Sequence, residues 1–358
     1  MSAAEKIVRP EIQAMHAYPV ADATGLVKLD VMESPYGLPK GLADEIGRIV
    51  AGLSLNRYPV PTATRLRAVI REVMQVPAGC DVLLGNGSDE CIQYVTATVA
   101  REGAAVMAPT PSFAMFSMHA FFYRLRFVGV PLCADFALDA EAFLEAMRKE
   151  KPALVWIAFP NNPTGNAFPV ADIERIVAAA PGLVVIDEAY QPFAGATFMP
   201  RLAEFENLVV MRTVSKIGMA GLRLGYVAGR AEWIDAFNKA RSPFNVNVVT
   251  EAIAIKLLEN KPVLDAQAAK VLAERERMRP ELERVPGLTV YPTAANFFLV
   301  RVAGATGAGT KAFDRLRAQG VLVKDFSGGL PALQNCLRLT VGTPDENRIL
   351  LTALREAL

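Results

Sequence analysis

The chain has 358 residues, of which 52% are hydrophobic, and its charged residues nearly cancel to a formal net charge of +1. This balance disfavours a nucleic-acid surface, and no apolar run approaches the roughly 20 residues of a membrane span. Four scattered cysteines without a C-x-x-C pair and only two histidines indicate neither a disulfide framework nor a metal site. Because the N-terminus also lacks an apolar signal-peptide core, we expect a soluble, cytoplasmic α/β protein of enzyme size.

The first 80 residues combine extended and helical segments. Residues 29–39 are rich in Pro and Gly and predict an extended arm, because Pro does not fit inside a helix. An amphipathic helix is predicted at 42–53 and a second helix at about 64–74, with another extended stretch at 56–61 between them.

Seven short apolar runs then follow, most of them separated by segments that can form helices. Fully apolar strands alternating with helices are typical of a parallel sheet covered on both faces. We therefore predict an α/β fold, with a mostly parallel seven-stranded sheet flanked by helices in a large domain of residues 30–240. The predicted strands lie at 81–84, 104–108, 125–130, 153–159, 183–186, 208–211 and 224–228, and the clearest helices at 91–100, 140–149 and 170–179.

After about residue 233 the pattern changes to longer charged helices and separated strands, which predicts a smaller α+β domain. We assign residues 241–358 to it, completed by residues 1–29 as an N-terminal arm. Its predicted helices lie at 249–259, 262–284, 311–319 and from 344, after a helix at 232–239, and its predicted strands at 288–291, 297–302, 321–324 and 336–341.

In a parallel sheet, ligands bind beyond the carboxyl ends of the strands, and polar motifs follow several of the predicted strands. Gly85-Asn86-Gly87-Ser88-Asp89-Glu90 opens a helix. Small residues there leave backbone N–H groups free at the positive end of the helix dipole, which suits a phosphate. The alternative is a plain helix cap, with Ser88 as the N-cap residue.

Two further motifs follow the next two strands. Pro160-Asn161-Asn162-Pro163-Thr164-Gly165 predicts a rigid turn, either a tight connection or a support from which Asn162 donates to a ring hydroxyl. Asp187 ends a buried strand and needs a cationic partner, either a pyridinium N–H or a nearby arginine. Tyr190, three residues later, can reach the same ligand.

The stretch 212–226 holds a single lysine, Lys216, between Val214-Ser215 and a segment of small residues that ends at Arg223. Most lysines are solvated surface charges. With Thr213, Ser215 and Arg223 beside it, however, Lys216 suits a Schiff base next to a bound phosphate. Together the motifs match the phosphate, ring hydroxyl, pyridinium and aldehyde of pyridoxal 5′-phosphate.

These motifs resemble those of the fold-type-I aminotransferases of the aspartate aminotransferase superfamily, and within it the histidinol-phosphate aminotransferase family, over nearly the whole chain. The most specific pieces are Tyr36-Gly37-Leu38-Pro39, Arg57-Tyr58-Pro59, Gly85–Glu90, Asn161–Gly165, Asp187–Tyr190, Ser215-Lys216 with Gly221-Leu222-Arg223, and Cys336–Thr343. The resemblance implies a homodimer that transfers an amino group between L-histidinol phosphate and 2-oxoglutarate, with glutamate as the recycled partner, in histidine biosynthesis. An aromatic-amino-acid transaminase, an amino-acid-phosphate decarboxylase and a non-catalytic ligand-binding protein on the same fold remain alternatives.

The resemblance also implies the role of each site residue. Lys216 carries the Schiff base, Asp187 pairs with the pyridine nitrogen, and Asn162 and Tyr190 hold the ring hydroxyl. The phosphate ligands are Gly87, Ser88, Asp89, Thr213, Ser215 and Arg223, with Phe113 stacked on the ring and Tyr58 reaching in from the neighbouring subunit. The implied substrate residues are Arg338, Lys324 and Tyr18.

The chain departs from the family pattern at four places. Met32-Glu33 replaces the usual Asn-Glu of the arm, and Lys324 replaces a second arginine, which keeps the charge but loses the planar fork. The segment between Lys216 and Arg223 is one residue shorter than in many relatives. Phe113 lacks the common hydroxyl, and its alternative role is core packing.

Overall fold

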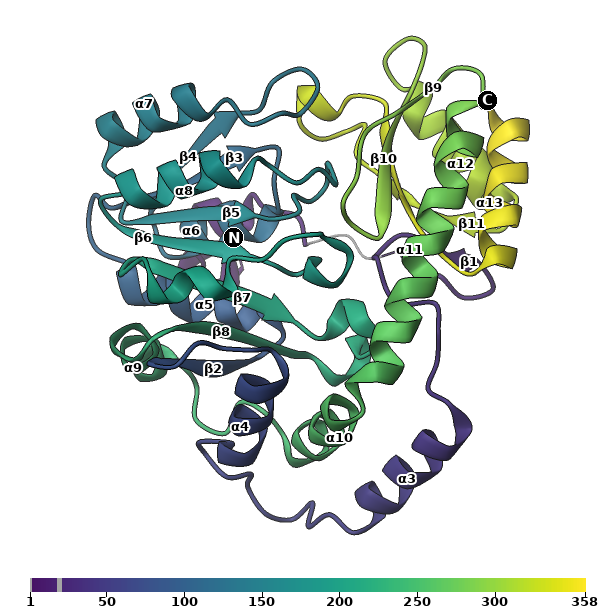
Figure 1. Cartoon of the computed structure of the whole chain (residues 1–358). Coiled ribbons are helices and arrows are strands. Elements are labelled where there is room, and N and C mark those ends of the chain that lie inside the picture. Colours follow the sequence, from purple (N-terminus) through teal and green to yellow (C-terminus); the bar gives the residue numbers. More distant parts are fainter. Residues whose placement is uncertain (1, 18–20) are drawn as a thin grey trace.

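The computed structural model describes residues 2–17 and 21–358. It shows a large helix-covered sheet and a second, smaller body beside it, linked by the long helix α11 (Lys261–Glu283) (Figure 1). The large sheet has seven strands in the order β2-β8-β7-β6-β5-β3-β4. These strands are β2 (Cys80–Asn86), β3 (Ala105–Thr110), β4 (Arg126–Pro131), β5 (Leu154–Ala158), β6 (Leu183–Asp187), β7 (Leu208–Thr213) and β8 (Leu224–Arg230).

The strand directions bring the polar motifs to one edge of this sheet. Strands β3 to β7 pair in parallel, whereas β8 runs antiparallel to both β7 and β2. The end of β2 at Asn86 therefore lies beside the start of β8 at Leu224, and Thr213 of β7 lies opposite Gly225. All seven predicted strands and the mostly parallel arrangement are confirmed.

Alternate residues of each central strand enter two different cores, one on each face of the sheet. In β6, Leu183 and Val185 join one cluster while Val184 and Ile186 join the other, as the two-residue period of a strand requires. The first core is closed by α5 (Ser88–Val99), α6 (Ala114–Phe122) and α9 (Ala231–Ala240), and the second by α4 (Thr64–Val73), α7 (Ala140–Glu150), α8 (Val170–Ala179) and α10 (Val248–Glu259).

The smaller body holds a four-stranded antiparallel sheet in the order β12-β13-β10-β9 and a parallel pair, β1 with β11. Its strands are β1 (Val27–Lys28), β9 (Leu288–Val290), β10 (Phe297–Val302), β11 (Val321–Leu322), β12 (Lys324–Asp325) and β13 (Cys336–Thr340), packed against α11, α12 (Ala308–Ala318) and α13 (Pro344–Ala357). The single strand predicted at 321–324 is wrong. The chain changes partner at Val323, because β11 pairs with β1 whereas Lys324 pairs with Arg338.

The arm that follows β1 is held against the smaller body by main-chain bonds. Leu29 donates its N–H to Leu322 and accepts from Thr340, and Met32 donates to the Thr340 hydroxyl at 3.1 Å. The arm thereby passes between the small sheet and the carboxyl edge of the large one. The domain boundaries at 30 and 240 remain a prediction. Within the described residues, no helix is long and apolar enough to cross a membrane.

Candidate active site

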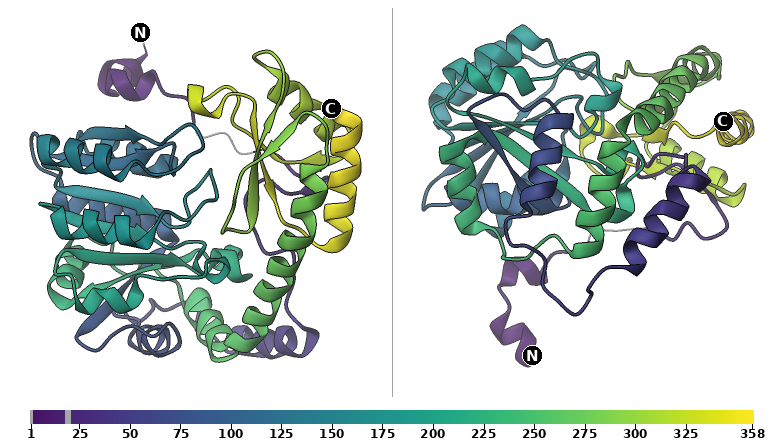
Figure 2. Two further views of the ribbon diagram at one scale, coloured as in Figure 1. Left: turned by 45° about the horizontal axis from the view of Figure 1, so that its top comes forward. Right: turned by 60° about the horizontal axis from the view of Figure 1, so that its bottom comes forward.

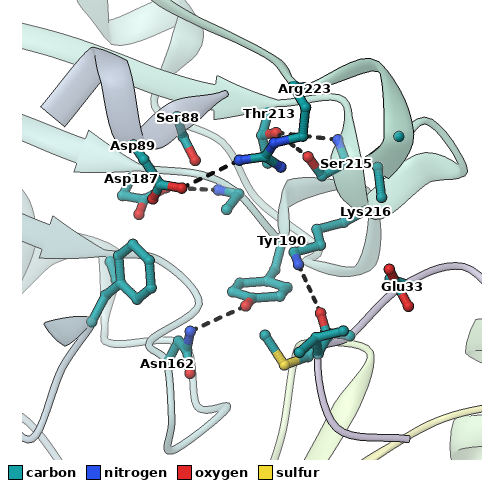
Figure 3. Close-up of a pocket in the computed structure, with 17 residues that line it drawn as sticks. Glu33, Ser88, Asp89, Asn162, Asp187, Tyr190, Thr213, Ser215, Lys216 and Arg223 are labelled. Carbon is teal, nitrogen blue, oxygen red and sulfur yellow. Dashed lines mark hydrogen bonds and ion pairs between the residues drawn. The ribbon is translucent and has the colours of Figure 1, made fainter. Parts of the chain in front are cut away.

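A cavity of about 340 Å³ opens at the carboxyl edge of the large sheet, facing the arm. Figure 3 shows the side chains that line it, with Tyr190 pointing toward Asn162 and Lys216 toward the arm. The structure brings together most of the predicted site residues here: Ser88, Asp89, Phe113, Asn162, Asp187, Tyr190, Thr213, Ser215, Lys216 and Arg223.

One end of the cavity is a cluster of donors around the N-terminus of α5. The helix begins at Ser88, and Gly87 (φ +82°) is its N-cap residue, so the alternative in which Ser88 caps the helix with its side chain is wrong. Thr213 and Ser215 share a hydrogen bond of 2.8 Å between their hydroxyls. Free N–H groups, hydroxyls and the helix dipole together favour an anion at this end.

Arg223 completes this end of the cavity in spite of its short spacing from Lys216. The backbone makes two short 3-10 turns, η3 (Ser215–Ile217) and η4 (Ala220–Leu222), and Arg223 then takes a left-handed conformation with φ 51°. Its guanidinium forms an ion pair of 3.3 Å with Asp89 and lies so close to Gly87 that a Cβ there would meet it at 2.7 Å.

Asp187 is a buried carboxylate at the end of β6. It accepts the N–H of Ala189 at 3.0 Å, and none of the described residues forms an ion pair with it. Burial raises the pKa of Asp187 to about 7, and the nearby carboxylates of Asp89 and Glu188 add to this rise. Among the described residues no arginine forms the alternative ion pair with Asp187, and the nearby Arg212 pairs with Glu188 instead.

Lys216 extends from η3 into the centre of the cavity. Its Nζ donates to the carbonyl oxygen of Val31 at 2.9 Å and lies 5.9 Å from the ring centroid of Tyr190 (Figure 3). Burial, together with the positive charge of Arg338, lowers the pKa of Lys216 to about 8. Near neutral pH, part of the population therefore carries a neutral, nucleophilic amine.

Asn162 links two parts of the site. Its amide donates to the Tyr190 hydroxyl at 3.2 Å, and its carbonyl oxygen accepts from Arg338 at 2.6 Å. Arg338 is buried on β13 and also donates to the main-chain oxygen of Asp30 at 2.8 Å. Its plane is fixed because it lies over the rings of both Phe297 and Phe326, at 5.4 and 5.3 Å from their centroids.

The other predicted residues lie outside the centre of the site or serve two roles. Phe113 lines the cavity and also meets the Phe116 ring edge-on at 5.7 Å, so it combines site and core contacts. Lys324 lies directly opposite Arg338 in the small sheet. Tyr58 is 81% exposed and does not line the cavity. Tyr18 lies outside the described residues.

The sequence reasoning missed the contribution of the arm backbone. Val31, Met32 and Glu33 line the cavity, and the Val31 carbonyl is the hydrogen-bond acceptor for Lys216. Met32 takes a left-handed conformation, φ 56°, that turns the arm at this point. The only sequence signal for this turn was the usual Asn-Glu pair of the family, which Met32-Glu33 replaces. The left-handed region favours Asn among residues other than Gly, so the usual Asn marks the position of the turn.

Comparison with known proteins places this geometry in a family. The family described as aminotransferase class I and II matches residues 24–354. The chain belongs to that family. It is 54% identical to histidinol-phosphate aminotransferase 1 of Ralstonia nicotianae over 99% of this chain and 95% of that protein. It is 53% identical to histidinol-phosphate aminotransferase 1 of Burkholderia lata, over 100% and 99%.

Solved aminotransferase structures share this architecture. The histidinol-phosphate aminotransferase of Sinorhizobium meliloti, in complex with pyridoxal 5′-phosphate, superposes with a TM-score of 0.86 at 26% identity, covering 98% of this chain and 97% of that one. The L-threonine-O-3-phosphate decarboxylase of Porphyromonas gingivalis has a TM-score of 0.79 at 21% identity, covering 92% and 99%, which shows the shared fold alone.

The cavity of this aminotransferase fits pyridoxal 5′-phosphate. Asp187 is buried without an ion-pair partner among the described residues, as expected for a carboxylate that pairs with a pyridinium N–H. The α5 N-terminus, the two hydroxyls and Arg223 supply donors for a phosphate at one end. Between these ends the Lys216 amine faces the cavity, where it can condense with an aldehyde.

Proposed function

We propose that this chain transfers an amino group between L-histidinol phosphate and 2-oxoglutarate, as a histidinol-phosphate aminotransferase of cytoplasmic histidine biosynthesis. The observation that carries the proposal is the placement of Lys216 between the buried Arg338 and the buried Asp187, which forms no ion pair with any residue that the structure describes. The full-length relatives at 54% and 53% identity, which carry that name, support the choice of substrate.

The cofactor-facing residues orient the bound group. Ser88, Thr213, Ser215 and Arg223 would hold the phosphate, and Asn162 with Tyr190 would hold the ring hydroxyl. Asp187 would keep a proton on the pyridine nitrogen, because a buried carboxylate beside a cation is stabilised in its charged form. When bound, pyridoxal 5′-phosphate supplies an electron sink that acidifies the α-hydrogen of the amino donor.

Lys216 is the proposed proton carrier. With cofactor and donor bound, the lowered pKa of about 8 would leave a usable fraction of the Nζ amine neutral. Such a neutral amine would act as the general base for the α-proton of the donor and, once protonated, as the general acid. The Val31 carbonyl oxygen, 2.9 Å from Nζ, accepts a hydrogen bond from the amine and fixes its position.

Arg338 is the proposed anchor for the acidic end of each substrate. A guanidinium fork fits a carboxylate and a phosphate equally well in geometry, so one site can accept glutamate and histidinol phosphate in alternate half-reactions. Its bond of 2.6 Å to Asn162 couples this anchor to the residue that faces the ring hydroxyl.

Spectral half-reactions test the proposal. Purified enzyme loaded with pyridoxal 5′-phosphate is mixed with a panel of amino donors, and loss of the visible cofactor absorption is followed. L-histidinol phosphate should convert the cofactor at a lower concentration than phenylalanine does, and Lys216→Ala should lose both the absorption and turnover. Normal turnover by Lys216→Ala, or release of carbon dioxide without any need for an oxo acid, would refute the proposal.

We also propose that the protein is a homodimer whose active sites are shared. The stretch between α3 (Lys40–Ala51) and α4 arches away from the rest of the chain (Figures 1 and 2). It carries large apolar side chains that are strongly exposed, namely Leu55 (69%), Tyr58 (81%) and Val60 (59%). An exposed apolar surface of this kind is typical of a protein interface.

A further inference from the structure

Arg338 and Lys324 form what we call the acid-binding end of the site. One buried carboxylate near it has no part in the proposed mechanism. Asp30 is 5% exposed, and its Oδ1 has no hydrogen-bond partner within residues 2–17 and 21–358. Its main-chain oxygen accepts from Arg338 at 2.8 Å, which places the residue beside the substrate anchor. A buried carboxylate oxygen without a donor is unfavourable unless nearby positive charge compensates it.

Two cations supply that compensation. Lys324 and Arg338 are direct partners across the antiparallel pair β12–β13, so their side chains lie on the same face and repel each other. Burial lowers the pKa of Lys324, Arg338 lowers it further, and the carboxylates of Asp30 and, to a smaller extent, Asp325 oppose both effects. Asp30 is therefore close enough to act on this pair of cations.

The neighbouring carboxylate of Asp325 does not replace Asp30 in this role. Successive side chains of a strand point to opposite faces, so Asp325 points away from the face that carries Lys324 and Arg338. Its oxygens are also engaged, since they accept from Thr310 at 2.8 Å and from the Ser327 hydroxyl at 2.5 Å. Of the two carboxylates, Asp30 therefore has the larger effect on Lys324.

We infer that Asp30 is a specificity-determining residue that sets the net charge of the acid-binding end to one positive charge, from two cations and one carboxylate. The inference rests on the proposed function. A phosphate monoester carries between one and two negative charges near neutral pH, whereas the side chain of glutamate carries one. Without the charge of Asp30, Lys324 and Arg338 would favour the phosphate over the carboxylate more strongly. Asp30 reduces this advantage, so that one anchor serves both substrates.

Inhibition by simple anions tests the inference without relying on substrate turnover. Enzyme loaded with pyridoxal 5′-phosphate, so that the cofactor phosphate site is filled, is titrated with inorganic phosphate and with acetate at constant ionic strength. Asp30→Asn should raise the preference for phosphate over acetate about fivefold, equivalent to roughly 1 kcal/mol. Asp314→Asn, the same charge change at an exposed position of α12, should leave this preference within about twofold.

A charge-compensation cycle provides the second arm of the test. Lys324→Met should lower the preference for phosphate, and the double variant D30N/K324M, with the native net charge, should return toward the native value. An unchanged preference in Asp30→Asn, or an equal gain for both anions, would overturn the inference. If Asp30→Asn fails to fold, Lys324→Met alone still tests the predicted direction.

Substrate kinetics then separate this inference from the proposed function. In Asp30→Asn the ratio of kcat/KM for L-histidinol phosphate over L-glutamate should rise with the preference for inorganic phosphate. If the native enzyme does not act on histidinol phosphate while the anion preference still follows the net charge, the proposed function fails and the role of Asp30 stands. If histidinol phosphate is the best donor and the anion preference does not change with the net charge, the proposed function stands and the role of Asp30 fails.

Discussion

Asp187 is a single residue at which stability and function oppose each other. Burial raises its pKa to about 7, so between its ordinary pKa, near 4, and pH 7 the folded chain holds a proton that the unfolded chain has lost. Stability of the cofactor-free protein therefore falls as the pH rises through this window, and the full penalty is present above pH 7. A shift of this size corresponds to at most about 4 kcal/mol.

We predict that Asp187→Asn stabilises the cofactor-free protein at pH 8, because it removes the buried charge but keeps an acceptor for Ala189. Its unfolding midpoint should rise by about 3 °C at pH 8, and the difference should vanish near pH 4. Adding pyridoxal 5′-phosphate should raise the midpoint of the native protein far more than that of the variant. A variant less stable than the native protein at pH 8 would contradict this account.

Gly87 is a residue at which added volume would disturb the phosphate end, the part of the cavity around Ser88 and Arg223. Its φ is +82°, and a Cβ there would meet the Arg223 guanidinium at 2.7 Å. Gly87→Ala should raise the dissociation constant for pyridoxal 5′-phosphate about tenfold or more, because Arg223 must move. The measurement is a titration of the cofactor-free protein, followed by visible absorption.

Gly103→Ala is the matched control for Gly87→Ala. Gly103 has a similar φ of +73°, but a Cβ there would meet nothing within 4 Å. The control should lose about 1 kcal/mol of stability from backbone strain and bind the cofactor like the native protein. Equal losses of cofactor affinity in both variants would show that strain, and not the contact with Arg223, is responsible.

Residue-level sequence reasoning predicted side chains that line the cavity but not the groups that the backbone contributes. Lys216, Asp187 and Asn162 were predictable because each follows an apolar strand, and the ends of such strands meet at one edge of a sheet. The Val31 carbonyl was not predictable, because any residue type supplies a carbonyl and the contact joins positions 185 residues apart.

At the scale of elements, the packing of β8 against the start of α5 sets the position of the phosphate end. A Cβ on Gly225 would meet the Ser88 nitrogen at 2.5 Å and the Gly87 carbonyl carbon at 2.7 Å, so strand and helix touch through backbone atoms. Gly225→Ala should lower stability by about 2–3 kcal/mol and raise the cofactor dissociation constant about tenfold.

Gly229, on the same strand, offers the comparison. A Cβ there would meet a methyl group of Val209 at 2.9 Å, which is a side-chain contact that can yield. Gly229→Ala should therefore lose about 1 kcal/mol and keep its cofactor affinity. Denaturant unfolding and cofactor titration of Gly225→Ala and Gly229→Ala measure the difference. Equal cofactor affinities in the two variants would show that the β8–α5 contact does not control cofactor binding.

The bounds of helices and strands were predictable where the local sequence pattern determines them. They were not predictable where the pairing partners of a strand determine them. The helix at 170–179 and the strand at 297–302 match their predicted ranges, because period and flanking turns define both locally. The run 321–324 looks like one strand, yet it divides between two sheets, because β1 and β13 compete for adjacent residues. Such competition is a tertiary effect that a short apolar run does not encode.

At the scale of the whole molecule, the position of Tyr58 supports an assembly larger than one chain. Its ring stacks on that of Phe244, with 4.7 Å between the ring centroids, although Tyr58 is 81% exposed. It does not reach the cavity of its own chain. A homodimer, in which this surface meets its symmetric copy, would bury it and allow Tyr58 to approach the partner's cofactor phosphate.

Subunit mixing tests whether the sites are shared. Lys216→Ala and Tyr58→Ala are each expected to be defective alone, the first in chemistry and the second in cofactor binding. If Tyr58 serves the neighbouring subunit, a mixed dimer has one site with both defects and one site with neither. After random exchange of equal amounts, half the dimers are mixed, so activity should recover to roughly a quarter of the native value.

If Tyr58 acted within its own chain, each mixed dimer would contain one Lys216→Ala site and one Tyr58→Ala site, and activity would equal the average of the two parents. The two arrangements therefore predict different activities from the same proteins. Sedimentation of each sample before and after exchange shows that dimers have formed, and the assay uses a low cofactor concentration, where weakened binding limits the Tyr58→Ala sites. Recovery above the parental average requires a dimer whose subunits complete each other's sites.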